Sequence, residues 1–105
     1  RQDSLNNSIV KFKDIVINKS SRSVKRNGNE ISLTNKEYEL LMILVDNKDK
    51  VVTREELLEK IWGYGYEPET NVTDVYVRYL RTKLNNENKE EYIHTVRSVG
   101  YIMRG

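Results

Sequence analysis

The chain has 105 residues, no cysteine, one histidine and a formal net charge of +2. This length fits one domain with one modest hydrophobic core, and the lack of cysteine excludes disulfides, thiolate catalysis and cysteine zinc sites while fitting a reducing cytoplasm. The longest unbroken apolar run, LLMILV at 40–45, is far too short to span a bilayer.

Charge is unevenly distributed along the chain. Residues 1–33 carry seven Lys or Arg and three Asp or Glu, residues 34–70 carry five and nine, and residues 71–105 carry six and four. A basic C-terminal third beside an acidic middle indicates two faces for two different partners. Ordinary solvated surface charge is the alternative explanation of the same counts.

The N-terminal third predicts a linker followed by a small sheet. Residues 1–8 are polar and aperiodic, as in the remnant of a linker. Four short β-prone runs follow at 9–13, 15–18, 23–26 and 30–33. Asn27 and Gly28 join the last two runs, and both residue types tolerate the positive φ angles of a tight hairpin turn. We therefore expect a four-stranded antiparallel sheet.

Two helices that begin with capping boxes are predicted next. Thr34 is followed three residues later by Glu37, and Thr53 is followed in the same way by Glu56. The first helix is apolar nearly all round, which is typical of a buried central helix. The second has one apolar and one acidic side, and we expect it to end at Gly63.

The segment TNVTDVYVRYLRTKL at 70–84 is rich in β-prone residues. Strand alternation would mix charged and apolar residues on one face, whereas an α-helix over 71–84 separates them. The core-facing stripe of that helix would be Thr73, Val77, Leu80 and Leu84. The opposite side would carry Asn71, Asp74, Val75, Arg78, Arg81 and Thr82, with Tyr76 and Tyr79 on the flanks.

This outer side has the chemistry of a nucleic-acid contact. Arginine offers forked donors to phosphates or guanine, a small side chain such as Val75 fits a thymine methyl, and tyrosines can donate to phosphates. A solvated helix with two arginines explains the same residues without a ligand. The neighbouring segments favour DNA, because a helix, a loop, this helix and a hairpin at 92–97 and 101–104 follow the plan of a winged helix.

The sequence resembles the C-terminal effector domain of the OmpR/PhoB class of bacterial two-component response regulators. The matching segments are LTNKEYELL at 33–41, VVTREELLEKIWG at 51–63, NVTDVYVRYLRTKL at 71–84 and IHTVRSVGYIMR at 93–104. The resemblance implies one α+β domain over 9–105, a winged helix-turn-helix with an N-terminal four-stranded antiparallel sheet, three helices and a C-terminal β-hairpin wing. It places the recognition helix 71–84 in the major groove of promoter DNA and the wing 93–104 at the minor groove.

The resemblance also implies which residues contact DNA. These are Asn71, Val72, Val75, Tyr76, Arg78, Tyr79, Arg81, Thr95, Arg97 and Tyr101. Asn71, Tyr76 and Tyr79 depart from the family, which often has an Arg, a His and, in some members, a base-reading Arg there. Arg97 is the expected minor-groove residue. Gly100 matches a tight-turn glycine, and Ser98 stands where a glycine is common.

Partners follow from the same resemblance. We expect the domain to bind as head-to-tail pairs on direct repeats of promoter DNA. We also expect a separate receiver domain on which a sensor kinase acts, and this chain leaves no room for that receiver domain. We expect RNA polymerase to contact the loop after the second helix. That loop consists of Gly63, Tyr64, Gly65, Tyr66, Glu67, Pro68, Glu69 and Thr70. A cytoplasmic location and no membrane partner, cofactor or metal are expected.

Two other functions compete with DNA binding. An enzyme is disfavoured, because His94 is the single histidine, Ser98 has no evident orienting acid or oxyanion element, and GYGY lacks the lysine and context of a phosphate loop. A winged helix that binds protein without DNA is the second alternative. It predicts an apolar or acidic outer side, whereas the segment 71–84 has Arg78, Arg81 and Lys83 against the single Asp74.

Overall fold

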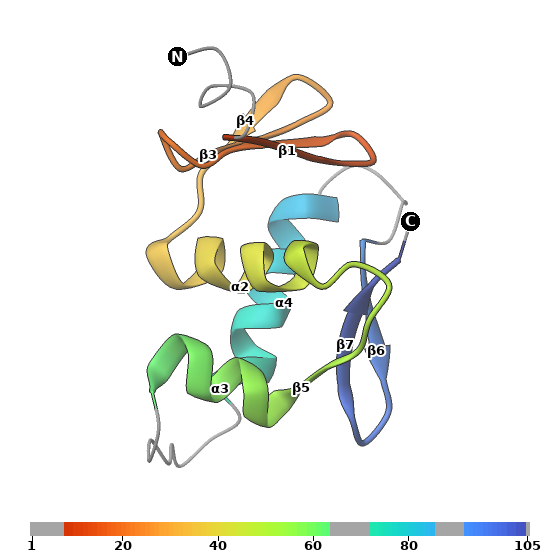
Figure 1. The fold of residues 1–105 in the computed structure, drawn as a ribbon. Helices are drawn as coiled ribbons and strands as arrows, with labels where there is room; N and C mark the ends of the chain where they lie inside the picture. The colour runs from red at the N-terminus through yellow and green to blue at the C-terminus, as the bar shows by residue number, and fades with distance from the viewer. Residues whose placement is uncertain (1–7, 64–71, 86–91, 105) are drawn as a thin grey trace. The chain divides into compact units, whose positions relative to one another are not determined.

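A computed structural model of the chain describes residues 8–63, 72–85 and 92–104 (Figure 1). The chain divides into two compact units, Arg1–Leu33 and Thr34–Gly105, and each unit contains a sheet of its own. Apart from Ser8, the expected linker lies outside the described residues.

The first unit is an antiparallel sheet with the strand order β1-β2-β3-β4. The strands are β1 (Ile9–Phe12), β2 (Ile15–Asn18), β3 (Ser23–Arg26) and β4 (Asn29–Ile31). Asn27 and Gly28 have φ angles of 53° and 85°, so the predicted hairpin turn is confirmed. Ile15 and Ile17, at alternate positions of β2, are fully buried, as the two-residue period of a strand requires.

The second unit is built around three helices among the described residues. They are α2 (Asn35–Asp46), α3 (Arg54–Trp62) and α4 (Val72–Asn85). Both predicted capping boxes are present, with Thr34 and Thr53 as the N-caps. Helix α2 packs against α3, α4 and β7, and Figure 1 shows α2 and α4 crossing each other. The prediction of a buried central helix is therefore confirmed.

A short strand that the sequence did not predict extends the wing. The strands β5 (Val52–Thr53), β6 (Ile93–Val96) and β7 (Gly100–Met103) form a sheet in the order β5-β7-β6. We expected Thr53 only as the N-cap of the second helix. Val52 and Thr53 form a strand because they pair with β7, where Val52 lies opposite Tyr101 and Thr53 opposite Gly100.

The wing turn corrects one expectation about glycine. Gly100 is the first residue of β7 and its φ is not positive, so its interpretation as a tight-turn glycine is wrong. It is needed for close approach, because a Cβ at this position would overlap with the carbonyl oxygen of Val52 and lie 2.8 Å from the Cα of Thr53. The left-handed conformation belongs to Ser98, with a φ of 65°. A glycine at that position would be free of strain.

The predicted fold class is confirmed. The described residues contain the four-stranded antiparallel sheet, the three helices and the C-terminal hairpin in the expected order.

Candidate nucleic-acid interface

Helix α4 buries the predicted stripe and exposes the opposite side. The stripe consists of Thr73, Val77, Leu80 and Leu84, of which the most exposed, Thr73, is only 5% exposed. The helical phase inferred from the sequence is therefore confirmed. Arg78 and Tyr79 are exposed on the other side, and Val72 and Val75 are partly exposed.

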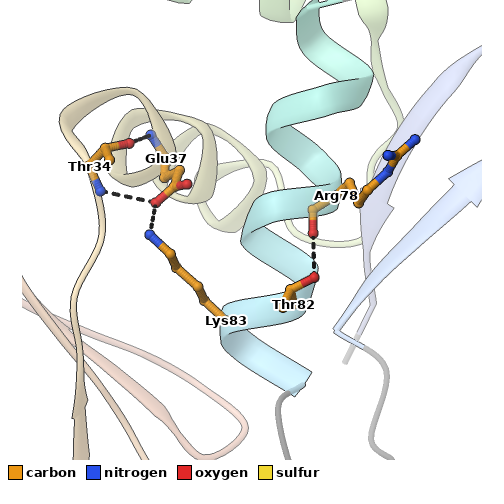
Figure 2. Close-up of polar contacts among 5 residues, drawn as sticks. All are labelled: Thr34, Glu37, Arg78, Thr82 and Lys83. Atoms are coloured by element: carbon orange, nitrogen blue, oxygen red, sulfur yellow. Dashed lines mark hydrogen bonds and ion pairs between the residues drawn. The ribbon is translucent and has the colours of Figure 1, made fainter.

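Two basic residues of α4 extend in different directions (Figure 2). The Nζ of Lys83 lies 2.6 Å from the Oε1 of Glu37, a buried carboxylate that also accepts a hydrogen bond from the Thr34 amide. The charge of Lys83 is thus matched at the start of α2, whereas we expected it to add to the basic outer side. Arg78 points away from Glu37, and among the described residues no hydrogen bond or ion pair engages its guanidinium group.

A cluster of aromatic rings in tilted and edge-to-face contact supports the exposed Tyr79. The ring of Tyr76 lies 5.3 Å from that of Trp62 and 5.8 Å from that of Tyr79, measured between centroids. On α2, the Nζ of Lys36 lies 5.6 Å from the Trp62 ring. These contacts join the three helices and leave Tyr79 49% exposed. The sequence placed Tyr76 and Tyr79 on the flanks of the helix but gave no signal that Trp62 supports them.

A carboxylate on α4 joins the start of α3 to the wing. The Oδ1 of Asp74 accepts hydrogen bonds from the Nε of Arg54, at 2.9 Å, and from the hydroxyl of Tyr101. Burial of Asp74 disfavours its charged form, but the hydrogen bonds from Tyr101 and Arg54 outweigh this effect, and the pKa of Asp74 is lowered. The hydrogen bond between Arg54 and Asp74 raises the pKa of Arg54. Burial has the larger effect on Tyr101, and together with the hydrogen bond to Asp74 it raises the pKa of that hydroxyl.

Arg81 of α4 also contacts Tyr101 and links α4 to the wing. The guanidinium groups of Arg54 and Arg81 lie 5.3 and 5.7 Å from the centre of the Tyr101 ring. Arg81 also donates two hydrogen bonds to the carbonyl of Ile93, at 3.1 and 3.0 Å, and one to the hydroxyl of Thr95 at 2.6 Å. We refer to Arg54, Asp74, Arg81 and Tyr101 as the tyrosine cluster. It connects α3, α4 and both strands of the hairpin.

The predicted wing residues differ in their accessibility. Tyr101 is 4% exposed, so it lies inside the protein rather than at its surface. Thr95 is exposed but accepts the hydrogen bond from Arg81. Arg97 is exposed in the wing turn, and in the described part of the chain its guanidinium has no hydrogen-bond or ion-pair partner. Direct DNA contact by Thr95, Tyr101 or Arg81 stays a prediction.

The arginines of α3, α4 and the wing turn therefore fall into two groups. Arg54 and Arg81 are held by hydrogen bonds within the tyrosine cluster. Arg78 on α4 and Arg97 in the wing turn are exposed and carry charge that the described residues do not neutralise. An anionic partner that meets α4 and the wing together would gain its charge-assisted hydrogen bonds from this second group.

Several predicted residues lie beyond the described part of the chain. Asn71 and residues 64–70 of the expected polymerase loop lie outside the described residues. Gly63 is described, and its φ of 106° and its amide bonds to the last turn of α3 confirm it as the end of that helix. Within the described ranges, no group of three or more acidic or histidine side chains is arranged to hold a metal ion.

The chain is similar to known transcriptional regulators. The family model described as "Transcriptional regulatory protein, C terminal" matches residues 28–103. The response regulator ArlR of Staphylococcus epidermidis is 48% identical over 96 residues, which cover 91% of this chain and 44% of that protein. ArlR of Staphylococcus aureus is 49% identical over the same length. The chain thus spans about half the length of the curated relatives it matches.

Solved structures have the same fold. The DNA-binding domain of Klebsiella pneumoniae RstA, in complex with the RstA box, has a TM-score of 0.81 and 28% identity, covering 91% of this chain and 96% of that one. The response regulator DrrB of Thermotoga maritima, an OmpR/PhoB homologue, has a TM-score of 0.81 and 35% identity, covering 93% of this chain and 45% of that one. The winged-helix architecture is therefore confirmed. Among the described residues, no helix has the length and apolar character needed to cross a membrane.

Proposed function

The chain belongs to the C-terminal, DNA-binding family of transcriptional regulators of the OmpR/PhoB type, and on that premise we propose that it binds specific double-stranded DNA at bacterial promoters. Helix α4 would enter the major groove, and the turn of the wing would meet the adjacent minor groove. The domain would serve as the output of a regulator controlled by phosphorylation.

The observation that carries this proposal is the position of two exposed arginines, one on α4 and one in the wing turn. Arg78 projects from the outer side of α4 and Arg97 from the wing turn, and neither has a counter-charge among the described residues. A duplex carries regularly spaced phosphates on both sides of each groove, so it can satisfy both arginines at once. A protein partner without DNA would instead favour an apolar or acidic surface here.

Individual roles follow from the exposure of each side chain. Val75 is partly exposed one turn before Tyr79, and a small apolar group there fits a thymine methyl. Arg78 would donate to a phosphate or a guanine edge. Tyr76 and Tyr79 would donate to phosphates, with Tyr79 the more accessible of the two. Val72, the first residue of α4, would lie at the start of this surface. A DNA contact by Asn71 rests on the sequence resemblance alone.

The further partners of the whole protein are part of the same proposal. The similarity to response regulators supports a receiver domain elsewhere in the full protein, on which a sensor kinase acts. We also propose that the protein binds as head-to-tail pairs on direct repeats. The loop that begins at Gly63 would contact RNA polymerase, and the exposed Glu55, Glu56 and Glu59 of the neighbouring α3 give that region an acidic surface.

Selection of DNA sites from a random library tests this function. The domain should enrich a short motif, repeated in direct orientation if pairs form. Val75→Ala should change the preference at one base step more than the total affinity, by about 1 kcal/mol at that step. Val51→Ala is the matched control, because Val51 is 41% exposed but precedes β5 and lies outside α4. Failure to enrich any motif would contradict the proposal and favour protein binding, and an unchanged motif for Val75→Ala would remove Val75 from the interface.

A further inference from the structure

The tyrosine cluster joins the wing to the recognition helix, and its role rests on the proposed function. We propose that it is a positioning device that fixes the wing relative to α4, so that Arg97 and Arg78 meet one duplex in a set geometry. Arg81 then acts on DNA through the wing rather than as a phosphate contact.

Three chain segments converge on the side chain of Tyr101. Arg54 is the first residue of α3, Asp74 lies in the first turn of α4, and Tyr101 lies in β7. The carboxylate of Asp74 accepts from both Arg54 and the Tyr101 hydroxyl, so the start of each helix is tied to the same strand. The amide of Arg54 also donates to the carbonyl of Val99 in the wing turn, at 3.3 Å.

Arg81 ties the second strand of the wing to the same helix. Its Nε and Nη2 both donate to the carbonyl of Ile93, the first residue of β6, and Nη2 also donates to Thr95 two residues further on. The planar fork of arginine makes these bonds together, which a lysine ammonium group does not reproduce. Each strand of the hairpin therefore has its own connection to α4, through Tyr101 for β7 and through Arg81 for β6.

These connections matter for DNA because recognition by two elements needs a fixed distance between them. Interface groups work when their supports hold them within about 0.5 Å of the productive geometry. Arg97 is carried by the turn of a two-stranded hairpin, and a small tilt of that hairpin moves its guanidinium relative to Arg78. Residues that prevent the tilt thus determine whether both arginines contact the duplex, even though Tyr101 itself is buried.

The position of the wing can be measured without DNA. The chain has no cysteine, so Thr82→Cys on α4 and Val99→Cys in the wing turn give two unique sites for nitroxide labels. Both side chains are exposed and lie outside the cluster. Pulsed electron paramagnetic resonance should give a narrow distance distribution, which Tyr101→Phe and Arg81→Lys should broaden or shift. Tyr79→Phe is the matched control, because it removes a hydroxyl from α4 at an exposed position, and it should leave the distribution unchanged.

The result decides the positioning role whether or not DNA binds. An unchanged distribution in both Tyr101→Phe and Arg81→Lys overturns the proposal. If Tyr101→Phe fails to unfold cooperatively, Arg81→Lys alone decides, since it retains the charge and most of the side-chain volume. A domain that enriches no DNA motif would contradict the proposed function, while the distance measurement would still decide the wing geometry.

The link to DNA reading is tested with the duplex recovered by site selection with the unmodified domain. Affinities are measured for Tyr101→Phe, Arg97→Ala and the two combined. If Tyr101 positions Arg97, removing both should weaken binding less than the product of the single effects, by about threefold or more. Multiplicative effects would overturn this link. Arg81→Lys should weaken binding without changing its salt dependence, whereas wild-type affinity for Arg81→Lys would mean that its fork is not needed.

Discussion

The salt dependence of binding by Arg78→Ala gives the sharpest test of which arginine meets the phosphates. Arg78 is exposed, and its guanidinium has no hydrogen-bond or ion-pair partner in the described part of the chain. Removing it should therefore change the free energy of unfolding by no more than about 0.5 kcal/mol. A loss of affinity would then report a lost contact to DNA.

The expected size follows from counterion release. One phosphate contact contributes about 0.9 to the slope of log affinity against log salt. Between about 50 and about 200 mM salt, a fourfold change, the affinity ratio of wild type to Arg78→Ala should therefore shrink by about 3.5-fold. At low salt, loss of a hydrogen bond to a charged group should cost about 1.5 to 3 kcal/mol of binding free energy.

Fluorescence anisotropy of a labelled duplex at five or six salt concentrations measures both quantities. Lys25→Ala is the matched control, because Lys25 is an exposed cation on β3, outside α4 and the wing, and its removal should preserve the slope. A slope for Arg78→Ala equal to that of wild type would refute a phosphate contact at this position. Equal losses of slope in Arg78→Ala and Lys25→Ala would mean that total charge, rather than position, governs binding.

Three further predictions concern the fold that supports the interface. Leu80→Ala should lower the free energy of unfolding by about 2 to 5 kcal/mol in a denaturant titration, because Leu80 is fully buried, and a near-wild-type value would contradict the helical phase of α4. Gly100→Ala should cost roughly 1 to 3 kcal/mol, since its Cβ overlaps with the backbone of Val52, and a wild-type melting temperature would show that β5 can move aside at little cost. The pKa of Asp74 is lowered in the folded state, so its contribution to stability is present above its ordinary value of 3.8 and is lost as the pH falls through the lower folded pKa. Asp74→Asn should therefore be less stable than wild type near neutral pH and should show a shallower loss of stability below about pH 3.8, and parallel acid-unfolding curves would contradict this.

Local chemistry explains why much of the fold was predictable from the sequence. A capping box, a helical stripe and an Asn-Gly turn each involve residues within a few positions of one another. Thr34 and Thr53 therefore predicted the starts of two helices, and Asn27 predicted a hairpin turn, without knowledge of the rest of the chain. The apolar stripe of α4 was found for the same reason, because it is periodic along one segment.

The features that escaped prediction depend on partners distant in the chain. Strand β5 has only two residues, and it exists because β7, nearly fifty positions later, pairs with it. Gly100 is required by that same pairing rather than by the turn. Lys83 and Glu37 meet across 46 positions, and Asp74 and Tyr101 across 27. A helical map assigns such side chains to a face but cannot tell whether another element already holds them.

The charged side chains of α4 that are engaged within the protein limit how many phosphate contacts the domain would make at a promoter. Of the charged side chains of α4, Asp74 and Lys83 form ion pairs within the protein, and Arg81 donates its hydrogen bonds to Ile93 and Thr95. The guanidinium of Arg78 has no hydrogen-bond or ion-pair partner among the described residues. If Arg78 and Arg97 supply the phosphate contacts, one copy makes few of them. Its salt-dependent affinity for a single half-site should therefore be modest. Two copies on adjacent repeats double those contacts, and each bound copy raises the effective concentration of the next when the proteins also touch. Occupancy of two direct repeats should therefore rise more steeply with protein concentration than occupancy of one repeat, and it should fall more steeply with salt concentration. Equal salt slopes for one-site and two-site duplexes would contradict this account of paired binding.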